Sequence, residues 1–186
     1  MSPQRLYKSI YDIARTINSS LEPSKVLAAI AEQVTRAMNA KGCFIRLLDA
    51  RGEMLLPGAY HGLSDRYAEK GPVQVEKSRL DQEVLEGKIV TIADVRTDDR
   101  FQYPAEAEAE GLVSLVVVPL TVGGERVVGV LRVYSDAARE FDSEELDFLS
   151  CIADLSGLAL ENARMYKALK RASELANEFN YRVFED

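Results

Sequence analysis

The stretch Ser114-Leu-Val-Val-Val-Pro-Leu-Thr-Val-Gly-Gly-Glu-Arg-Val-Val-Gly-Val-Leu-Arg-Val-Tyr134 decides the fold class of this chain. Two apolar runs, 114–121 and 126–134, flank a glycine-containing turn, a pattern typical of a β-hairpin. Both runs are almost continuously apolar, so we expect two central strands that are covered on both faces. Helices must therefore cover this hairpin on at least one side.

The two ends of the chain supply helical patterns. Apolar residues recur at helical spacing from Leu6 to Leu21, and a second helix is predicted from Pro23, a residue favoured in a first helical turn. Asp142 is a good N-cap for the last helix, and Glu145 completes a capping box. Gly129 is the small strand residue at which we expect this last helix to approach the sheet.

The apolar pattern of the last helix continues without Pro or Gly after Gly157. A helix of about 40 residues would be about 60 Å long, more than a compact domain can cover. The far end from Tyr166 onward therefore needs a partner, most simply the same segment of a second chain, or else it frays. The predicted homodimer interface comprises Tyr7, Tyr11, Tyr166, Leu169, Ala176, Phe179 and Val183.

The middle of the chain is predicted to be mostly β-structure. Residues 43–49 and 54–62 form a hairpin, a short helix lies near 80–86, and a strand spans 89–95. The polar segment 97–111 is a connection that becomes helical after Pro104. The order of elements predicts an α+β fold.

Composition restricts the classes of function. The chain has 186 residues with 23 basic and 30 acidic side chains, a net charge of −7, and no basic stripe. We therefore expect no nucleic-acid partner. The longest apolar run, Leu115–Leu120, is too short to span a membrane, and no signal peptide is evident. Two cysteines form no disulfide framework, which favours a cytoplasmic location.

Several short motifs resemble those of GAF domains. They are Ala59-Tyr-His-Gly-Leu-Ser64, Glu110-Gly-Leu-Val-Ser114, Val118-Pro-Leu120, Gly129-Val-Leu-Arg-Val133, and Phe141 to Asn162 in the last helix. The resemblance covers about residues 22–165, between an N-terminal helix (1–21) and a C-terminal helical extension (166–186). It implies a GAF/PAS-like antiparallel sheet of about six strands, an ordinary sheet size. The terminal helices would pack on one face, and loops with short helices would form a pocket on the other.

The resemblance implies a sensory domain, alone or excised from a larger bacterial-type signalling protein. Such domains hold a small molecule beside the sheet and signal through their end helices. A ligand-free dimerisation scaffold is the second reading, and a GAF-like reductase of free methionine sulfoxide is the third. We expect no enzyme, because the sequence has no phosphate loop, nucleophile elbow, metalloprotease helix or dinucleotide fingerprint.

Two arginines within predicted strands carry the strongest chemical signal. Arg132 alternates with Val130 and Tyr134, which by parity places it on the pocket side. Arg46 alternates in the same way with Phe44 and Leu48 and is a candidate for the same side. A buried guanidinium needs an anion. That anion is either an internal carboxylate, such as Asp94, or an acidic ligand held by the guanidinium fork.

Aromatic and polar residues near these arginines complete the predicted ligand site. The candidate pocket residues are Phe44, Arg46, Tyr60, His61, Tyr67, Asp94, Phe101, Tyr103, Ser114, Arg132 and Tyr134. Aromatic residues in the loops can equally form a satellite core, and His61, the single histidine, is expected at a strand end or pocket rim.

The sequence does not indicate a particular cofactor. Cyclic-nucleotide-binding GAF domains carry an Asn-Lys pair where this chain has Tyr134-Ser135. Neither Cys43 nor Cys151 lies where a bilin would attach, and nothing supports a haem. Close ligand pairs for a metal are absent from the sequence, so no metal site is predicted. The identity of the ligand stays open.

Overall fold

The computed structural model describes residues 3–20 and 22–182. Six strands form one antiparallel sheet in the order β3-β2-β1-β6-β5-β4. The strands are β1 (Gly42–Leu48), β2 (Met54–His61), β3 (Val73–Gln74), β4 (Val90–Ile92), β5 (Ser114–Val122) and β6 (Arg126–Ser135). The expectation of an α+β fold with a six-stranded antiparallel sheet is confirmed. The predicted hairpin 114–134 is the β5–β6 pair at its centre, with a register shift between Leu120 and Thr121.

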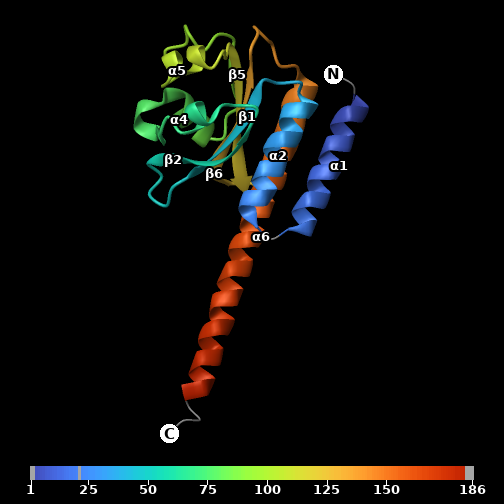
Figure 1. Cartoon of the computed structure of the whole chain (residues 1–186), viewed down its shortest axis with the longest axis vertical. Helices are drawn as coiled ribbons and strands as arrows, with labels where there is room; N and C mark the ends of the chain where they lie inside the picture. Colours follow the sequence, from blue (N-terminus) through green and yellow to red (C-terminus); the bar gives the residue numbers. More distant parts are fainter. Residues whose placement is uncertain (1–2, 21, 183–186) are drawn as a thin grey trace.

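Three long helices lie on one side of the sheet (Figure 1). They are α1 (Pro3–Ser19), α2 (Pro23–Ala37) and α6 (Ser143–Arg182). Two of them, α2 and α6, cover the face of the sheet, and α1 packs on the outer side of these two. Ile30 of α2 and Ile152 of α6 are fully buried with Leu131 and Val133 of β6 in what we call the helix-side core. This core accounts for the apolar stripes of the terminal helices.

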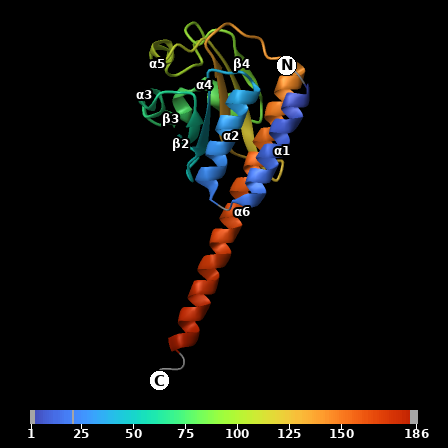
Figure 2. The same ribbon diagram turned by 45° about the vertical axis from the view of Figure 1, so that its right-hand side comes forward.

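The other face is covered by short elements of the segment between β2 and β5. These are α3 (Asp65–Ala68), the 3₁₀ turn η1 (Val75–Lys77), α4 (Arg79–Leu85) and α5 (Pro104–Ala109). They enclose a second set of buried side chains, the pocket-side core, which includes Phe44, Leu80 and Tyr134. Figure 2, turned from the first view, shows these short helices and the long helices on opposite sides of the sheet.

The N-terminus of α6 has the capping geometry that its sequence predicts. The backbone N–H of Glu145 donates to Asp142 Oδ1 at 2.8 Å, and the N–H of Asp142 donates to Glu145 Oε2 at 3.3 Å. Two backbone donors at the helix start are therefore satisfied by the two side chains in turn, which confirms the capping box.

The close approach between α6 and the sheet occurs at Gly157, and the expectation for Gly129 is wrong. A Cβ atom at Gly157 would overlap the carbonyl oxygen of Thr121 in β5, whereas one at Gly129 would overlap the carbonyl oxygen of Arg46 in the neighbouring strand. Gly157 therefore lets the helix axis lie close to β5. Gly129 is required for the contact between β6 and β1.

Helix α6 has 40 residues and extends well beyond the sheet and the other helices (Figures 1 and 2). At 1.5 Å per residue it is about 60 Å long. In the described part of the chain, residues 3–20 and 22–182, no helix combines the length and apolar content needed to cross a membrane.

Candidate functional site

The pocket side of the sheet holds two buried arginines. In the β1–β6 register Phe44 lies opposite Arg132, and Arg46 lies opposite Val130. Because side chains alternate along a strand, Arg46 and Arg132 project onto the same face, two register positions apart. Arg46 is 0% exposed and Arg132 is 2% exposed. The parity argument from the sequence therefore places both side chains as the structure does.

Arg132 forms a buried ion pair with Asp81 of α4. Its Nη2 atom lies 2.5 Å from each carboxylate oxygen of Asp81, and Asp81 is 0% exposed. Ser78 holds the carboxylate from the other side, because its hydroxyl donates to Asp81 Oδ2 at 2.6 Å. Burial is the largest single effect and lowers the pKa of Arg132, but Asp81 and Tyr134 together raise that pKa by more, so the guanidinium stays charged.

The sequence-based choice of Asp94 as the internal partner of Arg132 is wrong. Asp94 lies outside the cluster and accepts hydrogen bonds from Nε and Nη2 of Arg96, at 2.8 and 2.5 Å. These bonds lower the pKa of Asp94 to about 2. Asp94, in the irregular segment between β4 and α5, therefore pairs with its near neighbour Arg96, and the carboxylate that binds Arg132 comes from α4.

Within the described part of the chain, Arg46 receives no comparable carboxylate. Its Nη1 atom donates to the carbonyl oxygens of Leu55 and Gly71, each at 3.2 Å, and its guanidinium lies 4.2 Å from the centre of the Phe44 ring. Its Nε and Nη2 atoms are buried without a hydrogen-bond partner. Burial and then the charge of Arg132 lower the pKa of Arg46, although arginine stays protonated in proteins.

Two tyrosines and a lysine complete what we call the arginine cluster: Phe44, Arg46, Tyr67, Lys70, Asp81, Arg132 and Tyr134. The rings of Tyr67 and Tyr134 meet edge to face at 5.7 Å, and their buried hydroxyls make no hydrogen bond of normal geometry. Lys70 Nζ lies 3.2 Å from the centre of the Tyr67 ring. Burial, then the charges of Arg46 and Arg132, lower the pKa of Lys70 to about 6.

A cleft of about 240 Å³ lies on the outer side of this cluster, between α3 and α5. It is lined by Ser64, Arg66, Tyr67, Glu106, Ala109 and Glu110. Glu110 accepts hydrogen bonds from the backbone N–H of Ser64 at 2.6 Å and from its hydroxyl at 2.5 Å. The two motifs that end at Ser64 and begin at Glu110 are thus joined across the cleft, and Tyr67 belongs both to the cleft lining and to the arginine cluster.

The remaining predicted pocket residues lie around the cluster rather than in it. The hydroxyl of Tyr60 donates to Asp65 Oδ1 at 2.7 Å, and the hydroxyl of Tyr103 donates to the carbonyl oxygen of Pro72 at 3.1 Å. Phe101 is buried in the pocket-side core, and half-buried His61 ends β2 opposite Cys43. Ser114 is not brought into the cluster, because its hydroxyl donates to the carbonyl oxygen of Ala137.

Sequence reasoning missed Lys70, Asp81 and Glu110. The pattern Ser78-x-x-Asp81 is a capping-box signature and could have drawn attention to Asp81. Nothing in the local sequence distinguishes Lys70 from the exposed lysines, because its environment depends on strands that lie far away in the chain.

The two cysteines lie on the opposite side of the sheet from the arginine cluster. Cys43 is buried in the helix-side core, where burial raises the pKa of its thiol. Cys151 lies in α6 and lines a cleft of about 270 Å³ between α1 and α6. Among the described residues no group of three or more His, Cys, Asp or Glu side chains is arranged to hold a metal ion.

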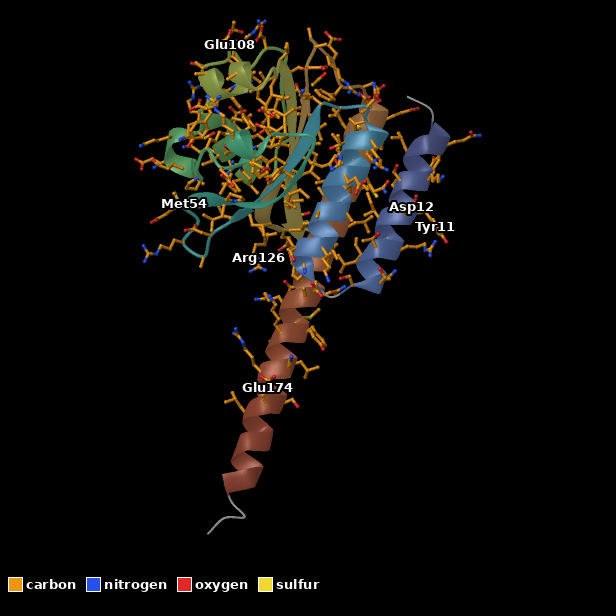
Figure 3. The ribbon with its side chains drawn as sticks, viewed as in Figure 1. Tyr11, Asp12, Met54, Glu108, Arg126 and Glu174 are labelled. Carbon is orange, nitrogen blue, oxygen red and sulfur yellow. The ribbon has the colours of Figure 1, made fainter. Side chains whose placement is uncertain are left out.

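Four of the predicted dimer residues are exposed in the described chain: Tyr7, Tyr11, Tyr166 and Leu169. Figure 3 shows Tyr11 on the outer side of α1, and Glu174 on the part of α6 that lies away from the rest of the fold. Ala176 and Phe179 belong to α6, but their side chains are outside the described part, and Val183 is outside the described residues.

Comparison with known proteins supports one family. A family model described as GAF domain matches residues 20–161. A methyl sulfide methyltransferase-associated sensor from Methanosarcina acetivorans is 30% identical over 134 residues, which cover 70% of this chain and 13% of the relative. The Nif-specific regulatory protein of Herbaspirillum seropedicae is 27% identical over 173 residues, which cover 87% of this chain and 30% of the relative. The chain thus spans less than a third of either relative.

Solved structures share the fold. The GAF domain of an Acinetobacter phosphoenolpyruvate-protein phosphotransferase has a TM-score of 0.74 and 26% identity, with 89% of this chain and 97% of that chain covered. A free methionine-R-sulfoxide reductase from Neisseria meningitidis has a TM-score of 0.73 at 19% identity, with 89% and 95% covered, a likeness that concerns the fold alone. The family model, the relatives and the six-stranded sheet agree, and this chain belongs to the GAF domain family.

Proposed function

We propose that this GAF domain is a regulatory sensor that binds a small molecule at the arginine cluster and signals as a dimer. The observation that carries the proposal is the set of buried polar atoms without partners. They are Nε and Nη2 of Arg46, Nε of Arg132, and the hydroxyls of Tyr67 and Tyr134. Buried polar groups in native proteins are nearly always hydrogen-bonded, so several unpaired atoms at one place indicate a missing partner.

A ligand at this place could influence the terminal helices through β6. Arg132 faces the cluster, whereas Leu131 and Val133, its neighbours in the strand, belong to the helix-side core with Phe148 and Ile152 of α6. A displacement of β6 would therefore change the packing of α6 through this shared core. The Arg132–Asp81 pair connects the same strand to α4. Strand β6 therefore contacts α4 on the pocket side of the sheet and α6 on the other side.

The exposed face of α6 supports the dimer. Leu158, Met165 and Leu169 are 52%, 54% and 70% exposed, and with Asn162 and Ala172 they recur at alternating spacings of four and three residues. This is the a/d pattern of a coiled coil, with Asn162 at an a position. A second copy in parallel would place Asn162 opposite its own equivalent, which is a common way to fix the register of two helices.

A dimerisation scaffold without a ligand is the second candidate function. It is favoured by the same face of α6 and by the closed state of the cluster, where Lys70 and Tyr67 pack together. A thiol-based reductase is a weaker candidate here. Its chemistry would need a cysteine at the pocket, and both cysteines of this chain lie on the other side of the sheet.

Native mass spectrometry of the purified chain, before and after denaturation, separates these functions. A sensor is expected to give a dimer with extra mass that leaves on unfolding, and this mass identifies the ligand. A clean ligand-free dimer that no added small molecule stabilises would favour the scaffold. A clean monomer would contradict the coiled-coil part of the proposal.

A further inference from the structure

The unpaired atoms of Arg46 form one side of its guanidinium group. Nη1 donates hydrogen bonds to the carbonyl oxygens of Leu55 and Gly71, so the donors that stay unpaired among the described residues are Nε and Nη2. These two N–H groups are parallel and match the two oxygens of a carboxylate in a fork of two hydrogen bonds. Phe44 stacks on the face of the guanidinium and makes no use of these two donors, which are buried at the edge of the group.

The charges of the cluster require one further negative charge. Arg46 and Arg132 are always protonated, and among the described residues they share one paired carboxylate, that of Asp81. Burial makes an unbalanced charge costly, because a low-dielectric interior solvates it poorly. A singly charged acid would balance the pair of arginines, whereas a doubly charged phosphate ester would leave an excess of negative charge unless Lys70 is protonated.

The surroundings of the free edge suit a small organic acid. Phe44, Tyr67 and Tyr134 offer apolar ring surface, and the two tyrosine hydroxyls can donate further hydrogen bonds. Lys70 Nζ lies 5.9 Å from the centre of the Phe44 ring on which Arg46 also stacks. Its hydrogen bond to the carbonyl oxygen of Tyr67 is long, at 3.4 Å, so little is lost when Lys70 turns toward a ligand.

Resting on the proposed small-molecule function, we infer that the ligand is a small carboxylic acid. Its carboxylate binds the Nε–Nη2 edge of Arg46, and the amine of Lys70 moves from the Tyr67 ring to donate to the same carboxylate. The acid enters from the cleft between α3 and α5 when Tyr67 turns aside. Arg132 stays with Asp81 and positions the cluster without holding the ligand.

Thermal unfolding of the full chain with a panel of paired compounds tests this inference. The panel contains aliphatic and aromatic monocarboxylic acids, each beside its neutral primary amide, and inorganic phosphate with methyl phosphate as the competing anions. At least one acid is expected to raise the melting temperature of the wild type, since a ligand that binds the native state alone stabilises it. Its amide and the phosphates are expected to have no effect.

Substitutions at Arg46 identify the binding edge. R46M removes the charge, and R46K keeps the charge but lacks the fork, which guards against a result caused by misfolding. Both are expected to weaken binding of the active acid by about 10- to 100-fold, the usual range for a charge-assisted hydrogen bond. R51M, at an exposed arginine in the β1–β2 turn, is the matched control and is expected to bind like the wild type.

The outcomes distinguish this inference from the proposed function. Equal stabilisation by acids and amides, preference for a phosphate, or unchanged binding by folded R46M and R46K would overturn the carboxylate assignment while leaving a small-molecule sensor in place. If no panel compound stabilises the chain, the carboxylate assignment is overturned. If native mass spectrometry also finds no bound molecule, the sensor proposal fails with it.

Discussion

Arg46 of β1 and Arg132 of β6 lie two register positions apart and project onto the same face of the sheet, yet of these two only Arg132 is paired with a carboxylate among the described residues, that of Asp81. Arg46 is equally buried and makes hydrogen bonds only to main-chain carbonyl oxygens among the described residues. The same type of side chain thus has two roles on one face. Arg132 joins α4 to the sheet through Asp81, whereas Arg46 keeps two N–H donors, Nε and Nη2, for a further partner.

Replacement of Asp81 by asparagine tests the structural role of the first arginine. D81N leaves the charge of Arg132 buried without a counter-charge, so we expect the free energy of unfolding to fall by about 3–5 kcal/mol. Urea denaturation measures this change. The exposed pair Arg79–Asp99 provides the control, since D99N is expected to change stability by less than about 1 kcal/mol. The double variant D81L/R132M should be more stable than D81N, and a less stable double variant would contradict this account of the pair.

Replacement of Arg46 by methionine tests the second role. An isolated buried charge is costly, and apolar replacements of buried ionic groups are often neutral or stabilise by about 1–4 kcal/mol. We expect R46M to be at least as stable as the wild type in urea denaturation without ligand. A loss of several kcal/mol would instead show that Arg46 is a structural residue and that its carbonyl partners suffice.

The acidity of Lys70 predicts a pH dependence. Its pKa is lowered to about 6 by burial, Arg46 and Arg132, and Glu106 and Glu110 act weakly in the opposite direction. Because the pKa of an unfolded lysine is about 10.4, the unfolded chain binds more protons at this site between these two pH values. The contribution of Lys70 to the free energy of unfolding should therefore rise with pH from about 6 upward and be least favourable below it.

The variant K70M isolates this contribution. The difference in stability between wild type and K70M, measured by urea denaturation at several pH values, should shift in favour of the wild type as pH rises above about 6. A carboxylate bound beside Lys70 would raise its pKa, so affinity for such a ligand should fall over the same range. A difference that stays flat between about pH 6 and about pH 10, the interval that separates these two pKa values, would contradict the buried position of Lys70.

The sequence predicted the regular parts of the fold well. Two almost continuous apolar runs and the turn residues between them identified the β5–β6 hairpin, and the capping box located the start of α6, because these signals are local. The two-residue strand β3 is too short to give a pattern and was not predicted. The assignment of Gly129 as the contact with the closing helix failed, since strand periodicity does not reveal which glycine lies under a helix.

The part of the candidate site that lies on the strands was predictable from the sequence. The part that comes from the segment between β2 and β5 was not. Parity placed Arg46, Phe44 and Arg132 on one face, because a strand has a fixed two-residue period. The partner of Arg132 depends on how the irregular segment between β2 and β5 folds over that face. Asp94 and Asp81 both lie in this segment, and only the packing of α4 against β6 brings Asp81 to the guanidinium.

The exposed seam of α6 predicts a parallel dimer in solution. L169E would place a charge at the centre of a helix–helix interface, so we expect the dimer dissociation constant to rise by at least about tenfold. Sedimentation equilibrium measures this change. E174Q, on the same exposed stretch of α6 but off the seam, should leave association unchanged (Figure 3). Equal association of L169E and wild type would show that this face is not the interface.

The most direct measurement is a crystal structure of the chain with the acid that gives the largest thermal stabilisation. We predict electron density for its carboxylate against Nε and Nη2 of Arg46, with Lys70 turned away from the Tyr67 ring and the Arg132–Asp81 pair unchanged. The cluster in its closed arrangement, with Lys70 still on Tyr67 and the acid bound elsewhere, would contradict the claim that this GAF domain senses a small molecule through Arg46.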